Sequence, residues 1–381
     1  MVIFTEEERM LQSTVRNFAV QELIPNALEA DKTEDFWHES FNKMADIGLT
    51  GITVDSQFGG SGAGYRQAAI AIEEIARGDA SSSVNLIAHL SLSTSTLNEF
   101  GNQDQKQKYL RNMASGKSIG AWALTEPGGG SDAASISTTA TRDGDDYVLN
   151  GSKMYITNAD VSDYMIVYAK LDKEADYKSI TAFIVESNTD GVTINPLKGK
   201  LGMRSSTASE VIFDNAKVPV ENRLGDEGSG FKNAMTILDS SRISIAAQCV
   251  GIGQGALDLA INYAKNRETF NKPITQHQAI QFMIADMAAA VHSARVVTMD
   301  AATLKDSKLP FSNEASIAKL IASEMCIDVT NKALQVHGGI GYFKDTNIER
   351  MFRDARVTTI YEGTSEIQRL IVARQTLQQY Q

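Results

Sequence analysis

The sequence predicts an α+β protein in which helices and strands occupy separate stretches of the chain. Hydrophobic residues recur at helical spacing through about the first 120 residues, short β-branched and aromatic runs follow, and long helical patterns return near residue 230. This segregation argues against the alternating units of a doubly wound fold. We therefore expect an N-terminal helical domain at 1–120, a middle β domain at 121–226 and a C-terminal helical domain at 227–381.

Composition and charge are those of an ordinary soluble globular protein. Of the 381 residues, 43% are apolar and 22% are charged. The formal net charge of -11 disfavours binding to nucleic acid or to an anionic membrane surface. The longest apolar stretch, 243–261, contains two glutamines and an aspartate, which makes it too polar for a membrane span. We expect neither a nucleic-acid partner nor membrane insertion.

The two cysteines and the N-terminus indicate a reducing compartment. Cys249 and Cys326 lie in apolar helical patterns whose spacing resembles neither a metal cluster nor a disulfide framework, so we expect buried thiols and no metal. The first residues lack the features of a signal or transit peptide. The chain is therefore expected in the cytoplasm of a bacterium, or in the mitochondrial matrix if it is a processed eukaryotic protein.

Local signals mark the ends of several expected elements. Thr5 and Glu8 form a candidate capping box at the start of a helix that Pro25 should bend or end. Strands are expected at 147–149, 164–168 and 180–185, and another should end at Pro219. Long helices are expected at 231–266, 280–304, 311–336 and from residue 364 onward.

One glycine motif matches the dinucleotide-binding fingerprint by letters alone. Gly251-x-Gly253-x-x-Ala256 lies inside a helical pattern with no strand before it, whereas the fingerprint needs a strand that leads into a helix. Close helix packing explains these glycines better.

A proline and three glycines stand where the helical domain gives way to the strands, in the segment Trp122-Ala123-Leu124-Thr125-Glu126-Pro127-Gly128-Gly129-Gly130-Ser131-Asp132. Such a loop exposes backbone N–H groups and lets a planar or phosphorylated ligand approach closely. A plain interdomain turn explains this segment equally well when it is considered alone.

Further motifs follow in a fixed order: Asn150-Gly151-Ser152-Lys153-Met154-Tyr155-Ile156-Thr157-Asn158, then 200–208, Leu238-Asp239-Ser240-Ser241-Arg242, Arg267-Glu268-Thr269-Phe270, Gln335-Val336-His337-Gly338-Gly339 and Tyr361-Glu362-Gly363-Thr364. In this order and across nearly the whole chain they resemble the acyl-CoA dehydrogenase family. The resemblance implies a middle β-barrel or sandwich domain and a C-terminal four-helix bundle. Ala208 and Asn271 depart from the family pattern, which usually has Thr and Gly there.

The resemblance implies an FAD site. Tyr155 would stack on the flavin ring, which is worth about 0.5–1.5 kcal/mol beyond burial for an aromatic pair, and the segment that begins at Arg267 would reach the flavin pyrophosphate of a neighbouring subunit. The residues implied to bind the cofactor are Trp122, Ala123, Leu124, Thr125, Gly130, Ser131, Tyr155, Ile156, Thr157, Arg267, Phe270, Gln278, Gln335, Val336, His337, Gly338, Gly339, Thr364, Ser365 and Glu366.

The same resemblance assigns the catalytic base to Glu362. The base removes the α-proton of an acyl-CoA thioester, and burial should raise the pKa of its carboxyl toward that task. Isovaleryl-CoA-type members carry their catalytic Glu at the position of Ser241, so that branch is disfavoured. The residues implied to bind the thioester are Ser131, Asp239, Ser240, Ser241, Arg242 and Gly363.

Several of these residues have simpler explanations. Arg242 could pair only with Asp239 across one helical turn, Thr364 could be only a helix cap, and His337 could be only a packing residue. Arg267 alone would be a solvated helix end. These alternatives remain open from the sequence.

The expected activity is FAD-dependent α,β-dehydrogenation of a short- to medium-chain acyl-CoA to the trans-2-enoyl-CoA. Electrons would pass to electron-transferring flavoprotein, and the enzyme would be a homotetramer or homodimer. The helix at 85–90 is expected to help form the floor of the acyl pocket. A branched-chain dehydrogenase or an oxidase of the same fold is the nearest alternative. A flavin-free binding protein that kept the fold is an alternative from a different class.

Overall fold

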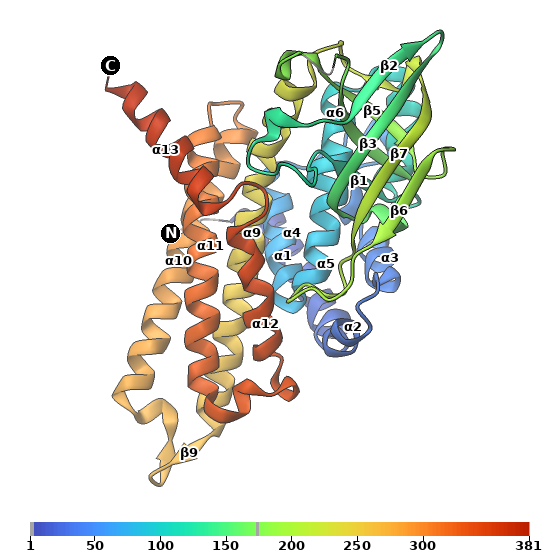
Figure 1. Ribbon diagram of the computed structural model, residues 1–381. Helices are drawn as coiled ribbons and strands as arrows, with labels where there is room; N and C mark the ends of the chain where they lie inside the picture. The colour runs from blue at the N-terminus through green and yellow to red at the C-terminus, as the bar shows by residue number, and fades with distance from the viewer. Residues whose placement is uncertain (1–3, 173–174, 381) are drawn as a thin grey trace.

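The computed structural model describes residues 4–172 and 175–380. Helices from the two ends of the chain lie together, and a sheet from the middle of the chain packs beside them (Figure 1). The helices and strands are therefore segregated along the chain as the sequence predicts.

The N-terminal part of the chain is helical. α1 begins with the predicted capping box, in which Thr5 Oγ1 accepts from the Glu8 amide at 3.1 Å and Glu8 Oε2 accepts from the Thr5 amide at 2.9 Å. A π-helical segment extends this helix to Leu23, so the chain leaves it just before Pro25. The helices here are α1 Glu6–Phe18, η1 Ala19–Leu23, α2 Ala27–Thr33, α3 His38–Asp46, α4 Tyr65–Gly78, α5 Ala80–Ile87, η4 Ala88–Thr94, α6 Ser95–Phe100, α7 Gln103–Gln105, η5 Lys106–Leu110 and α8 Arg111–Ala114.

The middle part forms one eight-stranded sheet with the order β6-β7-β3-β2-β4-β5-β8, in which β1 pairs in parallel with β4. The strands are β1 Gly120–Ala123, β2 Thr139–Asp143, β3 Asp146–Thr157, β4 Tyr164–Lys170, β5 Ile180–Glu186, β6 Val192–Pro196, β7 Ala208–Pro219 and β8 Arg223–Leu224. The expected strands lie within β3, β4, β5 and β7. The glycine- and alanine-rich β1 was not expected, because its strand conformation comes from pairing with β4 rather than from local propensity.

The C-terminal part contains three long helices that stand side by side, α9, α10 and α11 (Figure 1). Its elements are α9 Gly230–Asn266, β9 Glu268–Thr269, β10 Lys272–Pro273, α10 Gln278–Asp306, α11 Ser312–His337, α12 Ile348–Ala355 and α13 Ser365–Gln379. The four predicted helices agree with α9, α10, α11 and α13 to within two residues at their first residues. A side-chain carbon at Gly251 would lie 2.2 Å from the Glu73 carbonyl oxygen on α4, so this glycine serves close helix packing.

Two helices, α9 and α10, are long and apolar enough to cross a membrane when only length and composition are considered. The apolar window of α9 is 83% buried inside the protein, as expected of a core helix. The window of α10 is only 28% buried, so this helix presents much of its surface outward.

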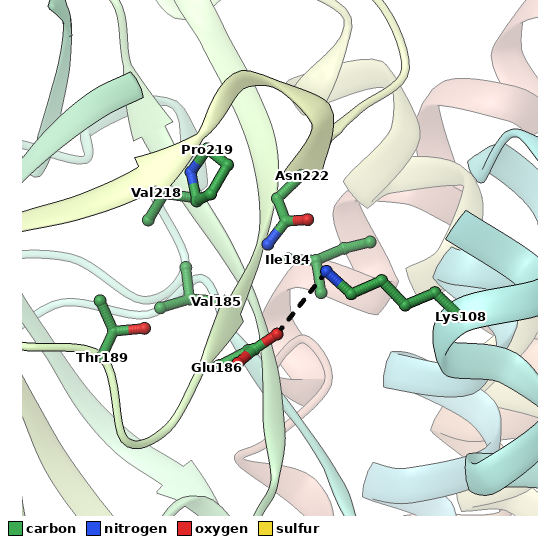
Figure 2. A pocket seen from close by; sticks show the side chains of 8 residues that line it. All are labelled: Lys108, Ile184, Val185, Glu186, Thr189, Val218, Pro219 and Asn222. Carbon is green, nitrogen blue, oxygen red and sulfur yellow. Dashed lines mark ion pairs between the residues drawn. The ribbon is translucent and has the colours of Figure 1, made fainter. Parts of the chain in front are cut away.

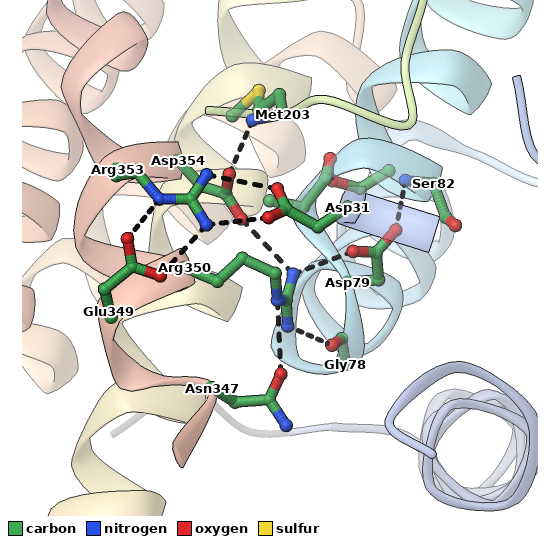
Figure 3. Close-up of polar contacts among 12 residues, drawn as sticks. Asp31, Gly78, Asp79, Ser82, Met203, Asn347, Glu349, Arg350, Arg353 and Asp354 are labelled. Atoms are coloured by element: carbon green, nitrogen blue, oxygen red, sulfur yellow. Dashed lines mark hydrogen bonds and ion pairs between the residues drawn. The ribbon is translucent and has the colours of Figure 1, made fainter. Parts of the chain in front are cut away.

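A buried network of charges joins α12 to the N-terminal helices (Figure 3). The Arg350 guanidinium donates to Asp79 Oδ1 at 2.8 Å, to the Gly78 carbonyl at 3.1 Å and to Asp354 Oδ2 at 3.2 Å. Asp354 Oδ1 accepts from the Met203 amide at 2.5 Å. Because the chain runs from the end of α12 at Ala355 toward Glu362, this network fixes one side of the loop that carries the candidate base.

Candidate active site

Glu362 lies on a short loop between two helical segments. The 3₁₀ turn Arg356–Thr359 precedes it, and α13 follows. Glu362 and Gly363 both have left-handed backbones, with φ of 53° and 92°. For a residue with a side chain this conformation is uncommon, and the surrounding contacts must hold it in place. Thr364 caps α13, with its hydroxyl oxygen 3.3 Å from the Ile367 amide. Its role as a helix cap is therefore compatible with its place in the Glu362 loop.

The Glu362 carboxylate meets Ser241 of α9. The Ser241 hydroxyl donates to Glu362 Oε2 at 2.5 Å, although the two residues are 121 positions apart. Burial raises the pKa of the Glu362 carboxyl, while the Ser241 hydrogen bond and the positive charges of Arg242 and Lys319 oppose the increase. Burial therefore increases the proton affinity of the Glu362 carboxyl, and the three neighbouring groups favour its ionised form.

The other predicted substrate residues of α9 surround this contact. Arg242 pairs with Asp239 one turn away, which was the simpler explanation of this arginine. Arg242 is also 5% exposed, and its Nε has no hydrogen-bond partner among the described residues. The arginine therefore retains one buried donor. Ser240 is buried and bonds the Thr236 carbonyl at 3.4 Å.

Three side chains on the inner side of the loop were not anticipated from the sequence. Lys319 of α11 donates to the Gly363 carbonyl at 2.7 Å, and Gln368 of α13 donates to the Glu362 and Gly363 carbonyls at 3.2 and 3.0 Å. The Tyr361 hydroxyl donates to Gln248 of α9. A lysine inside the apolar pattern of 315–326 was the available signal for Lys319.

The helix at 85–90 packs beside the same part of α9. Ser91 and Ser244 share a hydrogen bond of 2.8 Å, and Ser244 follows Ser241 by one helical turn. Asn85 bonds the Ser205 carbonyl at 3.3 Å, which ties α5 to the loop before β7. The helix lies close to the candidate base, while its role as a pocket floor stays a prediction.

An open aromatic platform lies on the middle sheet. Tyr155 is 69% exposed and has a φ of 61°, at a register shift between Lys153 and Ile156 where β3 pairs with β7. This bulge turns the ring outward instead of into the sheet. A side-chain carbon placed on Gly128 would meet no atom within 4 Å, so the glycine loop is open as well. An exposed flat ring beside accessible backbone fits a planar cofactor such as flavin.

A buried ion pair holds this glycine loop against β3. Lys153 is fully buried, and its ammonium donates to Glu126 Oε1 at 2.7 Å and to the Leu124 carbonyl at 3.2 Å. Glu126 also accepts from the Ser137 and Thr138 amides at 2.6 and 3.0 Å. The loop therefore has a fixed path across the strand that carries Tyr155.

The predicted cofactor residues of the first segment have different environments. The Trp122 indole N–H donates to Thr96 at 3.2 Å and to Tyr168 at 3.1 Å, so its polar atom is already satisfied within the protein. Ala123 and Leu124 are buried, whereas Gly130 and Ser131 are exposed. The side chain of Trp122 therefore contacts Thr96 and Tyr168, and the exposed Gly130 and Ser131 offer the accessible groups of this segment.

A second set of predicted cofactor residues lies at the far end of the helical bundle, near the β9 hairpin (Figure 1). His337, the last residue of α11, follows Lys319 by 18 positions, which corresponds to about 27 Å along the helix. One chain therefore does not bring this set to Glu362. The residues of this set are Arg267, Phe270, Gln278, Gln335, Val336, His337, Gly338 and Gly339.

Within this second set the side chains divide into exposed and buried ones. Phe270 is 88% exposed with a φ of 52°. His337 is buried, stacks on Tyr263 with ring centroids 4.6 Å apart, and has Nδ1 2.8 Å from the Ala333 carbonyl. The His337 side chain is therefore a packing residue, which is the simpler of its two explanations, the other being contact with the cofactor. Val336 is also buried.

Two cavities lie away from Glu362. Figure 2 shows the smaller one, of about 120 Å³, where Lys108 lies 3.9 Å from Glu186 at the edge of the sheet. The other, of about 310 Å³, lies among α1, α4, α9 and α12. Neither is lined by a predicted site residue, and no group of three or more potential metal ligands occurs among the described residues.

Comparison with known proteins matches all three parts of the chain. Family models described as the N-terminal, middle and C-terminal domains of acyl-CoA dehydrogenase match residues 5–117, 121–216 and 228–377. The chain belongs to the acyl-CoA dehydrogenase family. This membership confirms the predicted family and α+β fold.

Individual members of the acyl-CoA dehydrogenase family are similar over almost their whole length. The mitochondrial short-chain specific acyl-CoA dehydrogenase of Bos taurus is 46% identical over 375 residues, which cover 98% of this chain and 91% of that protein. The structure of butyryl-CoA dehydrogenase from Megasphaera elsdenii superposes with a TM-score of 0.97 at 38% identity, covering 99% of this chain and all of that one (100%). A chain from a structural study of the electron transferring flavoprotein of Acidaminococcus fermentans superposes equally well, with a TM-score of 0.97 at 40% identity and 99% coverage of both chains.

Proposed function

We propose that this protein is an FAD-dependent acyl-CoA dehydrogenase that converts a short- to medium-chain acyl-CoA to the trans-2-enoyl-CoA. The observation that carries the proposal is the buried Glu362 carboxylate, held by Ser241 on a left-handed loop in a chain of this family. Relatives described as short-chain specific support the proposed length of the substrate's acyl chain.

Glu362 removes the α-proton of the thioester. The α-proton of a thioester is much less acidic than a carboxylic acid. A raised pKa of the Glu362 carboxyl therefore reduces the pKa difference between the proton donor and the base. Burial raises the pKa of Glu362, while the Ser241 hydrogen bond and the positive charges of Arg242 and Lys319 oppose the increase and favour the ionised form that accepts the proton. FAD, when bound, supplies the acceptor for the β-hydride, and the α,β double bond forms as both hydrogens leave.

Ser241 bears on the branch of the family. Its hydroxyl touches the Glu362 carboxylate, so positions 241 and 362 face the same small volume. A carboxylate at either position would therefore reach a shared point, which explains how one family can place its base at one or the other. With Ser at 241 and Glu at 362, a straight-chain substrate is favoured over the isovaleryl type.

We place FAD on the platform of the middle sheet, where Tyr155 would stack on the flavin ring. Gly130 and Ser131 would offer accessible backbone and hydroxyl groups beside Ile156 and Thr157, and the residues at the start of α13, Thr364, Ser365 and Glu366, would approach from the helical side. Arg267 would bind the pyrophosphate of a neighbouring subunit, because its planar fork can hold two phosphate oxygens at once.

Electron-transferring flavoprotein is the electron acceptor that we propose, from family membership. The compartment would be the cytoplasm in a bacterium, or the mitochondrial matrix if the chain is a processed eukaryotic protein. We also propose the domain limits 1–120, 121–226 and 227–381, which fall between α8 and β1 and between β8 and α9.

A homotetramer or homodimer would complete the site. The apolar surface of α10 is mostly uncovered in one chain, and Phe282 and Phe270 are 60% and 88% exposed. Burial of such a surface against a second copy is favourable, and it would bring the Arg267 segment to a partner's site. We expect light scattering to give a mass of two or four times the 41.4 kDa of one chain. A stable monomer with a full complement of FAD would contradict this assembly.

Anaerobic bleaching of the bound flavin tests the substrate assignment. We expect butanoyl-CoA and hexanoyl-CoA to bleach it faster than palmitoyl-CoA or isovaleryl-CoA, because the relatives described as short-chain specific and the serine at position 241 favour short straight chains. Bleaching by dithionite but by no acyl-CoA would reject the dehydrogenase. Rapid peroxide formation in air would favour the oxidase, and a colourless protein that takes up no FAD would favour the flavin-free binding protein.

A further inference from the structure

The Glu362 loop is held by hydrogen bonds to its backbone carbonyls. Gln368 donates to the carbonyls of Glu362 and Gly363, and Lys319 donates to that of Gly363 at 2.7 Å. A peptide group is planar, so fixing a carbonyl also fixes the direction of the N–H on the next residue. These donors therefore define the path of two consecutive left-handed residues.

Lys319 is an unusual residue for this position. It is 0% exposed, on the side of α11 that faces α9, and its ammonium bonds a backbone carbonyl instead of forming a close pair with a carboxylate. Burying an ammonium group is costly, so a lysine here needs a compensating role. A methionine of similar length would pack without that cost.

We propose that Lys319 is a positioning residue for the reaction: it holds the Gly363 carbonyl and keeps a positive charge on the inner side of the Glu362 loop. This inference rests on the proposed role of Glu362 as the base. It assigns Lys319 no contact with substrate. Its contribution is to fix the loop geometry and to favour the ionised carboxylate.

The charges around the Glu362 loop determine in which direction the pKa of Glu362 moves when the charge of Lys319 is removed. Glu362 faces Ser241 and Arg242 from α9 and Lys319 from α11. The charge of Arg242 is partly neutralised by Asp239, whereas Lys319 forms no such close pair among the described residues.

Lys319 itself faces the Cys249 thiol, Arg242, Glu324 and Glu362. Burial lowers the pKa of its ammonium to about 8, so it is mainly charged at pH 7. Removing this charge should raise the pKa of Glu362. Because the base must be ionised to accept a proton, the acidic limb of the kcat/KM profile should then move to higher pH.

Three substitutions separate the hydrogen bond from the charge. Lys319→Met removes both, Lys319→Gln keeps a donor without the charge, and Lys319→Arg keeps both. The control is Lys217→Met, which removes a lysine that is 62% exposed and pairs with Asp143 on the middle sheet. Each variant is prepared as the FAD-loaded full chain, and kcat, KM and the pH profile are measured with butanoyl-CoA.

We expect Lys319→Met to lower kcat by up to about 100-fold with little change in KM, as for a displaced catalytic group, and to move the acidic limb to higher pH. Lys319→Gln should regain part of kcat but keep the shifted limb. Lys319→Arg and Lys217→Met should behave as the wild type in the position of the limb.

Two results would overturn the inference. The first is a folded, FAD-loaded Lys319→Met protein with wild-type kcat and an unshifted acidic limb. The second result applies if Lys319→Met does not fold. It is a Lys319→Gln protein whose kcat/KM profile has its acidic limb at the same pH as that of Lys319→Arg. Failure of the proposed function appears separately, as a wild-type protein whose bound flavin is bleached by dithionite but by no acyl-CoA. Failure of the assignment of Glu362 as the base appears as a Glu362→Gln variant that still oxidises butanoyl-CoA.

Discussion

Replacing Glu362 by Gln should abolish acyl-CoA oxidation while leaving the protein folded and yellow. Gln has nearly the same shape as Glu, and its amide cannot accept the α-proton. Loss of a general base typically costs 10²- to 10⁴-fold, and we expect a loss of about 10⁴-fold in dye-linked turnover with butanoyl-CoA. FAD content should stay at the wild-type level, because the platform at Tyr155 lies on the middle sheet and does not include the carboxylate.

The matched control for this variant is Glu221→Gln. Glu221 is 75% exposed near the edge of the sheet and makes only a loose pair with Lys108 at 3.8 Å. It should show wild-type turnover. Turnover of Glu362→Gln within a few-fold of the control, at the same FAD content, would mean that another group removes the proton.

Arg350→Met should destabilise the fold more than any surface substitution of the same kind. Arg350 is 2% exposed and compensates the buried carboxylates of Asp79 and Asp354 (Figure 3). Removing one partner of a buried pair leaves uncompensated charge and typically costs about 3–5 kcal/mol. We expect a lower urea midpoint by circular dichroism. Arg369→Met, which breaks an exposed pair with Glu324, should cost less than about 1 kcal/mol.

The effect of Arg350→Met should depend on pH with a definite sign. Burial raises the pKa of Asp354 to about 6, although Arg350 and the Met203 amide oppose the increase. Without Arg350 that pKa rises further, and the ionised carboxylate becomes more unfavourable. The Asp354 carboxylate of the variant is therefore neutralised at a higher pH than that of the wild type, whose pKa is about 6. The difference in the free energy of unfolding between variant and wild type should shrink as pH falls toward about 6 and level off below it. If Arg350→Met lost the same free energy of unfolding relative to the wild type at pH 5 and at pH 8, this explanation would be contradicted.

The sequence predicted the parts of the fold that have a strong local signal. Long helices such as α9 and α11 follow from a hydrophobic period that runs for more than twenty residues. Gly120–Ala123 became a strand only through pairing with β4, and α12 is short and rich in charged residues. Their structure comes from distant partners, which a local pattern does not contain.

The site divides in the same way. Glu362, Tyr155 and Ser241 stand in segments whose order resembles a known family, so the resemblance was sufficient to name them. The contact between Ser241 and Glu362 spans 121 residues, and only the packing of α9 against the loop reveals it. Lys319 and Gln368 donate to backbone carbonyls of the Glu362 loop, and these contacts depend on how α11 and α13 pack against that loop. The lysine within an apolar helical pattern marks Lys319 as unusual, but it does not show which group the ammonium contacts.

The most direct test of the base is hydrogen exchange at the α-carbon without oxidation. A thioester with sulfur in place of the β-carbon has acidic α-hydrogens and no β-hydride to transfer, so proton removal can be followed alone in D₂O by mass spectrometry. We predict that the wild-type protein loaded with FAD exchanges the α-hydrogen and that Glu362→Gln does not. Exchange at the wild-type rate in the Glu362→Gln protein would contradict the assignment of Glu362 as the base.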